Sequence, residues 1–418
     1  MPKNSFWLPF LLFAAHAFPQ TPLTLDRCIQ LAQDAPSSVS VARQQTVIAR
    51  YGITAARAGL YPLLTLQNSY GYNSPVGDTF RFVALNAVRE YVNLGAADLN
   101  IDTSGRVRAE IARAKADQRL AQASLNISQR DIRRLVTTAF YRLVLARRLA
   151  QVARDALAES QRFQELTQRL FEGGEAAQAD VIKAASDTSF QQLALSNAEL
   201  EAQLANHELA SFWTTDVTAP LSVVDSLDQL AAVAVNAEAG RPFLARPEFA
   251  ALDAARDGFL ADARRTKADL LPQMHITYQY GIDSYRLNYN DRGQAIIASL
   301  IIPIFDWHRT RSTMDQFRLQ AGQVETNRAV AERSFSREYQ DALARVNQIY
   351  GQLTLTNEQV RLSTENLRLA RVRYQGGEGL ALDVVAAQSQ LAQARANQYT
   401  AKANYANARA DLEVSAGR

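Results

Sequence analysis

Two short stretches of this 418-residue chain carry the same pattern. Residues 169–175 read Arg-Leu-Phe-Glu-Gly-Gly-Glu and are followed by Asp180-Val181, and residues 373–378 read Arg-Tyr-Gln-Gly-Gly-Glu and are followed by Asp383-Val384. The second Gly-Gly pair follows the first by 203 residues, and the two Asp-Val pairs have the same separation. A glycine after a long periodic segment is typical of a helix C-terminus, where the chain reverses. Each stretch therefore predicts the turn of a helical hairpin.

Further matches lie upstream of the two predicted turns. Leu60-Tyr61-Pro62 corresponds to Leu270-Leu271-Pro272, and Tyr70-Gly71 corresponds to Tyr280-Gly281, at a separation of 210 residues. Because these features recur in the same order, we predict that one structural unit is used twice. We place the first repeat at 18–213 and the second at 246–418, joined by a linker or equatorial segment at 214–245.

The distribution of proline predicts unusually long helices. None of the twelve prolines falls in 76–219 or in 304–418, and proline in a helix interior costs about 3 kcal/mol or more. Within these stretches apolar or small residues recur in steps of three and four, the spacing of a coiled-coil seam. The seam positions are Leu149, Ala153, Ala156, Ser160, Phe163, Thr167 and Leu170, and then Tyr339, Leu343, Val346, Tyr350 and Leu353. We predict antiparallel helical hairpins at about 105–213 and 309–415.

Between the helical segments the period changes to two, which predicts strands at about 63–73, 94–102, 273–283 and 294–304. The clearest alternation has large apolar side chains at every second position of 274–282, with tyrosines near its end. An apolar face of this kind is typical of a transmembrane β-barrel strand, and equally of an antiparallel sheet half covered by helices. Four strands cannot close a barrel, since the smallest common barrels have eight. Strands in lipid must therefore be pooled between copies of the chain, eight from two copies or twelve from three.

The N-terminal segment predicts export. Residues 6–18 are mostly apolar, follow Lys3, and contain the small-residue pattern Ala15-His16-Ala17. This is typical of a secretory signal peptide, which we place at 1–17. Elsewhere no run of about 18 apolar residues predicts a membrane helix. An exported chain with alternating strands and no membrane helix favours the barrel interpretation.

Composition argues against several function classes. The chain has 45 basic and 42 acidic residues, so no nucleic-acid footprint is predicted. Cys28 is the only cysteine, so it cannot form an intrachain disulfide, and we interpret it as a core thiol. The four histidines (His16, His207, His275 and His308) lack metal-ligand spacing, and no phosphate loop or nucleophile elbow occurs. We expect no enzymatic activity, no cofactor and no metal site.

With its two-fold repeat and its Arg-Tyr-x-x-Gly and Asp-Val signature at 373–384, the sequence resembles the TolC-type outer membrane efflux proteins, also called outer membrane factors. Pro303-Ile304-Phe305-Asp306, before an arginine-rich helix start, is similar to the family's second-strand exit. The resemblance implies a mainly α fold with a β-barrel part. Three chains would form a homotrimer, with a twelve-stranded barrel in the outer membrane of a Gram-negative bacterium and a periplasmic α-barrel.

The implied function is a passive exit channel of a tripartite efflux pump or type I secretion system. Its implied partners are a periplasmic adaptor (membrane fusion) protein, an inner-membrane transporter and outer membrane lipid. The resemblance also implies an equatorial belt of small helices, here 21–34 and part of 214–245. Since family members often carry a C-terminal extension to this belt and this sequence stops at Arg418, we expect the belt to be reduced.

The resemblance implies roles for particular residues. Asp180 and Asp383 would form carboxylate rings at the closed periplasmic mouth, although both also suit the first turn of a helix. Tyr374 matches a tyrosine that holds the hairpins closed, and it also completes the packing seam. Gly379 and Ala386 replace an arginine and an aspartate of the best-known gate, so the closing contacts would be weaker or built differently. The predicted adaptor contacts are the tips Gly173, Gly174, Glu175, Gly376, Gly377 and Glu378.

A soluble periplasmic coiled-coil adaptor or scaffold is the alternative interpretation. It would use the same hairpins and treat the alternating segments as a small capping sheet. The tyrosine-flanked apolar face of 274–282 distinguishes the two, because a soluble sheet has no need to expose it.

Overall fold

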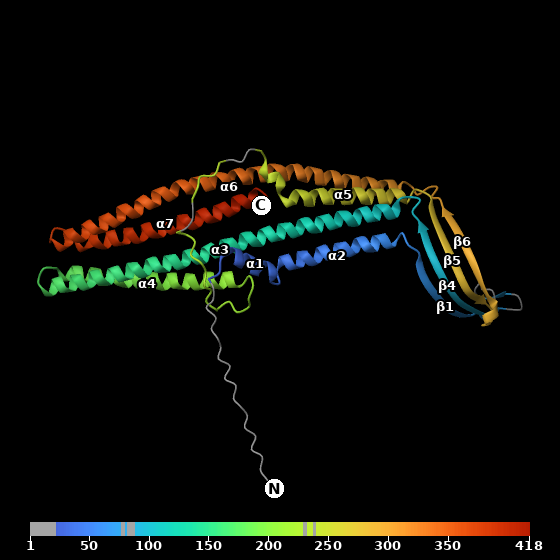
Figure 1. The fold of residues 1–418 in the computed structure, drawn as a ribbon, viewed down its shortest axis with the longest axis horizontal. Coiled ribbons are helices and arrows are strands. Elements are labelled where there is room, and N and C mark those ends of the chain that lie inside the picture. The colour runs from blue at the N-terminus through green and yellow to red at the C-terminus, as the bar shows by residue number, and fades with distance from the viewer. Residues whose placement is uncertain (1–21, 77–79, 82–87, 229–231, 237–239) are drawn as a thin grey trace, which may run out of the picture. The chain divides into compact units, whose positions relative to one another are not determined.

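The computed structural model describes residues 22–76, 80–81, 88–228, 232–236 and 240–418 (Figure 1). The signal peptide predicted at 1–17 lies outside the described residues. The fold is mainly helical with one four-stranded antiparallel sheet, which confirms the predicted class. The helices are α1 (Leu25–Asp34), α2 (Ser38–Ala58), α3 (Arg106–Glu172), α4 (Gln178–Ala210), α5 (Pro247–Ala268), α6 (Arg309–Gln375) and α7 (Ala381–Ser415). No helix among the described residues combines the length and apolarity needed to cross a membrane.

The strands and short turns complete the element order. The strands are β1 (Leu63–Tyr72), β2 (Pro75–Val76), β3 (Phe80–Arg81), β4 (Arg89–Ile101), β5 (Gln273–Ser284) and β6 (Arg292–Ile301), and the 3-10 turns are η1 (Pro242–Ala245) and η2 (Tyr289–Asp291). The series α2, β1, β4, α3, α4 recurs as α5, β5, β6, α6, α7 (Figure 1). Helices α3 and α6 each have 67 residues, as expected for one unit used twice.

Two strand ends differ from the sequence-based bounds. β4 begins at Arg89, well before the predicted 94, because the polar residues Arg89 and Glu90 pair with Tyr72 and Gly71 on β1. β6 ends at Ile301 rather than at 304. Pro303 has no backbone N–H to donate, so the hydrogen-bond ladder stops before it.

The described chain divides into two compact units. The first, called here the helical unit, comprises the described parts of Met1–Ala35, Arg133–Ala234 and Val346–Ala410. The second, called the strand-bearing unit, comprises the described parts of Pro36–Ile132, Val235–Arg345 and Asp411–Arg418. Helices α3, α6 and α7 contribute residues to both.

In the strand-bearing unit, the sheet has the order β1-β4-β5-β6. One row of the register joins Leu64, Ala97, Tyr278 and Ile296 across all four strands. Leu64 and Ile296 at the two edges are 75% and 74% exposed, so this face carries uncovered apolar side chains.

The opposite face of the sheet is polar. The Thr277 hydroxyl donates to the Asp98 carboxylate at 2.7 Å, and His275 Nδ1 lies 2.9 Å from the Asn100 amide oxygen. These side chains alternate along β4 and β5 with the apolar ones, so the two faces differ in character. The alternation read from the sequence therefore describes a real two-faced sheet.

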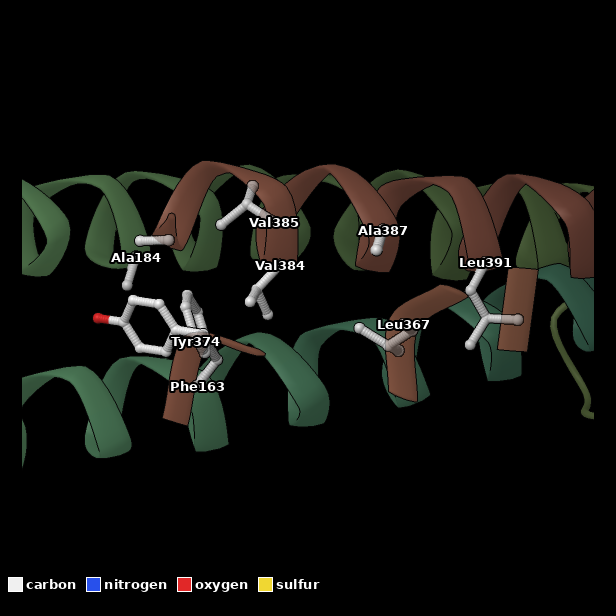
Figure 2. Packing of buried hydrophobic residues seen from close by; sticks show 9 residues of the cluster. Phe163, Ala184, Leu367, Tyr374, Val384, Val385, Ala387 and Leu391 are labelled. Atoms are coloured by element: carbon white, nitrogen blue, oxygen red, sulfur yellow. The ribbon is translucent and has the colours of Figure 1, made fainter. Parts of the chain in front are cut away.

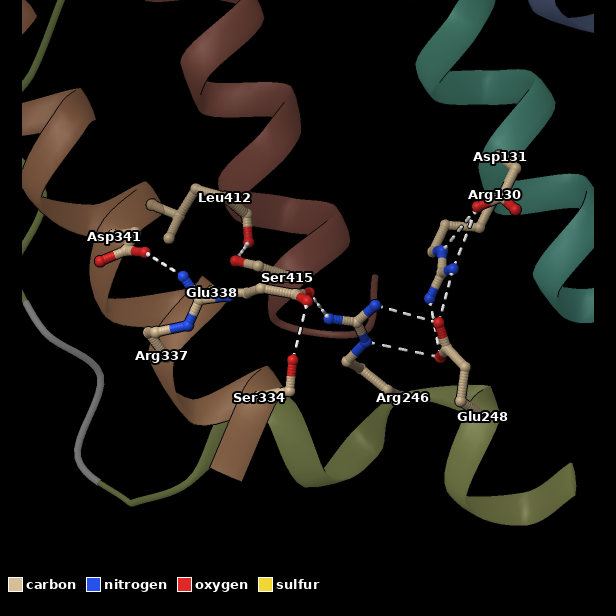
Figure 3. Close-up of polar contacts among 10 residues, drawn as sticks. All are labelled: Arg130, Asp131, Arg246, Glu248, Ser334, Arg337, Glu338, Asp341, Leu412 and Ser415. Carbon is tan, nitrogen blue, oxygen red and sulfur yellow. Dashed lines mark hydrogen bonds and ion pairs between the residues drawn. The ribbon is translucent and has the colours of Figure 1, made fainter. Parts of the chain in front are cut away.

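A network of ion pairs around the buried Arg130 and Arg246 side chains joins α3, α5 and α6 in the strand-bearing unit (Figure 3). The Glu248 carboxylate accepts hydrogen bonds from Arg130 at 2.8 and 2.9 Å and from Arg246 at 3.0 Å. Arg246 also donates to Glu338 at 2.7 Å, and its guanidinium lies 3.7 Å from the centre of the Phe335 ring. The two arginines hold the pKa of Glu248 at about 2, although burial acts in the opposite direction.

In the helical unit, the linker after α4 follows the helices closely. Asn206 accepts from the Leu221 N–H at 2.9 Å and donates to the Ala219 carbonyl at 2.9 Å. Leu23 and Val223 form a parallel bridge that ties the N-terminal segment to the linker. Cys28 on α1 is fully buried, as predicted, and burial raises the pKa of its thiol to about 11.

Candidate functional site

The turns of both hairpins lie in the helical unit, at the same end of it (Figure 1). Gly173 donates to the Arg169 carbonyl at 3.1 Å and Glu175 to the Leu170 carbonyl at 2.7 Å. In the second hairpin, Gly376 donates to Val372 at 3.0 Å and Glu378 to Arg373 at 2.9 Å. The two turns thus satisfy the last helix carbonyls in the same way.

The second glycine of each pair makes this reversal possible. Gly174 and Gly377 have φ values of 80° and 76°, in the left-handed region that residues with a Cβ rarely adopt. The predicted tip residues Gly173, Gly174, Glu175, Gly376, Gly377 and Glu378 are all exposed. Two carboxylates and bare backbone therefore face solvent at this end of the unit.

Asp180 and Asp383 occupy the third position of α4 and α7 respectively. The Asp383 carboxylate accepts a 3.4 Å hydrogen bond from the N–H of Leu380, just before its own helix, which is the ordinary chemistry of a helix start. Asp383 is exposed, and Asp180 is half-buried. Of the two predicted gate carboxylates, Asp180 is the one whose charge raises the pKa of the Tyr374 phenol.

Tyr374 belongs to a buried cluster to which helices α3, α4, α6 and α7 contribute (Figure 2). Its ring packs against Phe163 of α3, with ring centres 5.2 Å apart, and is next to Ala184 of α4. The remaining members come from α6 and α7: Leu367, Ala381, Val384, Val385, Ala387 and Leu391. The first and second hairpins therefore meet at Tyr374.

The hydroxyl of Tyr374 has an unusual environment. It is buried and has no hydrogen-bond partner of ordinary geometry among the described residues. Burial raises the pKa of this phenol, the Asp180 carboxylate raises it further, and Thr167 opposes the change. Thr167 of α3 and Asp180 of α4 are therefore the polar side chains that influence the pKa of the Tyr374 phenol.

Contacts that sequence reasoning missed lie further along α3 from the tip. Arg371 of α6 forms an ion pair with Glu159 of α3, and Gln388 of α7 donates to the Glu159 carbonyl at 3.3 Å. Arg395 of α7 lies 3.9 Å from Asp155, one turn further along α3. An open pocket of about 180 Å³ lies beside the Arg371–Glu159 ion pair, bounded by Phe163 and Tyr374. No local pattern signals such contacts, because their partners are more than 200 residues apart.

A further group of polar contacts lies within the first hairpin, between α3 and α4. Ser160 of α3 donates to the Asp187 carboxylate of α4 at 2.6 Å, and its hydroxyl is 3.0 Å from that of Thr188. Ser160 and Asp187 are both buried. Ser160 was predicted as a seam position, whereas Asp187 was not.

No group of three or more histidine, cysteine, aspartate or glutamate side chains suited to a metal ion occurs in the part of the chain that the structure describes. The site instead combines apolar packing, ion pairs and turn carboxylates, all of which hold helices against one another.

Comparison with protein families gives one clear match. The sequence profile of the family described as "Outer membrane efflux protein" matches residues 28–215 and 244–418. No curated protein sequence matches the chain significantly.

Solved structures share the fold. The outer membrane protein VceC from Vibrio cholerae has a TM-score of 0.81 and 17% identity, covering 94% of this chain and 96% of that one. The CmeC outer membrane channel of Campylobacter jejuni has a TM-score of 0.83 and 15% identity, covering 100% and 93%. The open state of the MtrE outer membrane channel of Neisseria gonorrhoeae has a TM-score of 0.81 and 21% identity, covering 94% and 88%. At these identities the likeness concerns the fold.

Proposed function

The chain belongs to the outer membrane efflux protein family, and from this premise we propose that it is the outer membrane exit duct of a tripartite efflux pump or a type I secretion system. In this proposal the protein is a passive conduit. A periplasmic adaptor and an inner-membrane transporter open it and supply the energy.

One observation carries the proposal: a four-stranded sheet with an uncovered apolar face is joined to two long helical hairpins. The edge strands β1 and β6 each pair on one side only, and free edges are not tolerated in lipid. Three copies joined edge to edge would close twelve strands into a barrel. A soluble adaptor would have no need to expose Leu64 and Ile296 to water, so we favour the duct.

The test is reconstitution of the mature protein. We expect detergent-dependent solubility, a trimer on gels that dissociates on heating, and discrete conductance steps in planar bilayers. A monomer that is soluble without detergent and gives no conductance would overturn the proposal and support the soluble scaffold.

We further propose that Asp180, Asp383 and Tyr374 form the periplasmic gate. Three copies of Asp180 and of Asp383 would form carboxylate rings that favour cations. The exposed tip residues, from Gly173 to Glu175 and from Gly376 to Glu378, would contact the adaptor. Gly379 fits this tight turn, because a Cβ there would lie 3.0 Å from the Tyr374 backbone nitrogen.

Substitutions at the gate test whether each residue controls conduction or serves only local structure, as a helix-start residue or a packing residue. Asp180→Ala and Asp383→Ala should reduce cation preference by removing ring charge. Unchanged conductance and selectivity in both would exclude the rings. Tyr374→Ala should raise basal conductance more than Tyr374→Phe, because the ring makes the packing contacts while the hydroxyl lacks an ordinary hydrogen bond. Equal effects would assign the closing role to the hydroxyl.

A further inference from the structure

The open pocket beside the Arg371–Glu159 ion pair lies between the two hairpins of the helical unit. The lining residues that carry the argument are Arg162, Phe163 and Leu166 of α3 with Arg371 and Tyr374 of α6. The volume of the pocket is about 180 Å³, and a cavity of about 150 Å³ accommodates a benzene ring. The pocket therefore has the size for a small molecule that touches both hairpins.

One wall of the pocket is apolar and held in place by packing. The rings of Phe163 and Tyr374 meet edge to face, with their planes at 62° (Figure 2). They are 4% and 7% exposed, so neighbouring side chains fix both rings and a small part of each borders the pocket. Leu166 is half-buried and packs against the same cluster. A flat apolar group in the pocket would gain contact with this wall.

The polar part of the lining carries an excess of positive charge. Glu159 is the only carboxylate that lines the pocket, and it pairs with Arg162 through Oε1 and with Arg371 through Oε2. Two cations thus share one anion, which leaves one net positive charge. A guanidinium has five N–H donors, and Glu159 is the one described side chain to which either arginine donates. The remaining donors suit a carboxylate, which accepts two parallel hydrogen bonds from an arginine.

The neighbouring ion pair does not cancel this excess charge. Asp155 and Arg395 line a second, smaller pocket that also borders Glu159, and their contact at 3.9 Å adds no net charge. A cationic ligand would meet charge of its own sign at close range, which costs free energy. Charge complementarity therefore selects an anion, and the apolar wall selects an anion with a flat apolar body.

We propose that this pocket binds a small aromatic carboxylate. The ring of the ligand lies against Phe163 and Tyr374, and its carboxylate pairs with Arg162 and Arg371. The ligand thereby joins α3 of the first hairpin to α6 of the second. A ligand stabilises the arrangement to which it binds better. Resting on the proposed function, the consequence is that the ligand favours the closed duct and lowers its basal conductance.

Fluorine NMR of para-fluorobenzoate measures binding to the purified protein in detergent. The wild type should broaden the probe signal saturably, and para-fluorobenzyl alcohol, which has a similar shape and no charge, should respond far less. Arg162→Gln should raise the dissociation constant about twofold to fivefold, the usual range for one exposed ion pair. This variant keeps the Arg371–Glu159 contact between the hairpins. Leu166→Trp should abolish saturable binding, because the indole occupies the pocket.

Arg368→Gln is the matched control for the loss of charge. Arg368 is exposed and pairs with Glu365 three residues away on its own helix, as Arg162 does with Glu159, but it does not line the pocket. This control should bind the probe as the wild type does. Equal weakening in Arg368→Gln and Arg162→Gln, or equal binding of the uncharged alcohol, would overturn the proposal. Because Arg162 is an exposed residue, this comparison does not depend on the folding of Leu166→Trp.

Conductance in planar bilayers keeps this proposal apart from the proposed function. The probe should lower the basal conductance of the wild type and leave that of Leu166→Trp unchanged. Conducting wild-type channels without saturable probe binding would overturn the ligand site alone. Saturable binding by a wild type that forms no channels would overturn the proposed function and support the ligand site. Saturable binding that leaves conductance unchanged would overturn the stabilisation of the closed duct by the ligand.

Discussion

Glu159 forms one of the charged contacts that join the two hairpins. Its carboxylate pairs with Arg371 of the second hairpin and with Arg162 of its own helix. The pair with Arg371 is partly screened by water, so its net contribution is about 0.5–1 kcal/mol in each copy of the chain. In the proposed gate, where Gly379 stands in place of the arginine that the family resemblance implies, this contact would supply an alternative ion pair to the closed state.

Charge reversal tests the contribution of this ion pair to closure. Glu159→Arg and Arg371→Glu should each raise basal conductance, and the double variant should restore part of the closed state because the ion pair is re-formed. The measurement is conductance in planar bilayers without adaptor. Arg162→Gln is the matched control, since it removes only the pair within α3. Strictly additive effects in the double variant would contradict a role for the pair.

At this scale, sequence reasoning identified single-helix properties and missed contacts between helices. The predicted seam residues Ser160, Phe163 and Thr167 are buried, because burial within a hairpin follows the local period. The pairing of Glu159 with Arg371 depends on how one hairpin lies against the other. No local period encodes that register.

Helix α5 begins in a network of ion pairs with its neighbours in the strand-bearing unit. Glu248 in its first turn connects Arg130 of α3 with Arg246, and Arg246 connects to α6 through Glu338. The network therefore sets the position of α5 between its neighbours.

The depressed pKa of Glu248 makes this contact depend on pH. Its pKa is about 2 in the folded protein against 4.5 for a free side chain, so the stabilisation is complete above pH 4.5. It is lost as the pH falls towards 2. The shift corresponds to about 3 kcal/mol. Glu248→Gln should therefore lower the unfolding free energy at neutral pH, and this difference from the wild type should shrink between pH 4.5 and 2.

Denaturant unfolding in detergent at several pH values measures that difference. Comparing variant with wild type removes the contributions of other carboxylates, such as Asp257 and Asp102, whose pKa values are also lowered. A difference that does not change with pH would show that the charge on Glu248 contributes little.

Elements were predicted well where one physical rule dominated. The absence of proline from 304–418 predicted long helices there, and the Gly376-Gly377 pair predicted the reversal that separates α6 from α7. The start of β4 was missed because Arg89 and Glu90 are polar, and their strand geometry comes from pairing with β1 rather than from their own alternation. Pairing of this kind is a tertiary property that a short window of sequence does not contain.

At the scale of the whole molecule, helices α4 and α6 each expose an apolar face among the described residues. Helix α6 exposes Leu355, Leu362 and Leu369 at intervals of seven residues, with exposed fractions of 70%, 53% and 47%. Helix α4 exposes Phe190, Leu193, Leu200 and Leu204. Each face has coiled-coil spacing, which suits a ring of copies in which α4 of one chain packs on α6 of the next.

A charge placed on this face tests the proposed trimer. Leu362→Asp should convert the heat-modifiable trimer to smaller species on gels, because the apolar face would then bury an unpaired carboxylate. Thr354→Asp, at another exposed position of α6, is the matched control. A trimer of unchanged stability in Leu362→Asp would mean that copies join through the sheet edges alone.

Cys28 has a practical consequence for such experiments. The only cysteine of the chain is fully buried, and its thiol has a pKa of about 11, so little thiolate exists at neutral pH. Thiol reagents should therefore label the native protein very little. Cysteines introduced at the tips can be modified selectively without first removing Cys28. Once the helical unit unfolds, the same thiol becomes accessible and reactive, and its labelling rate then reports the integrity of α1.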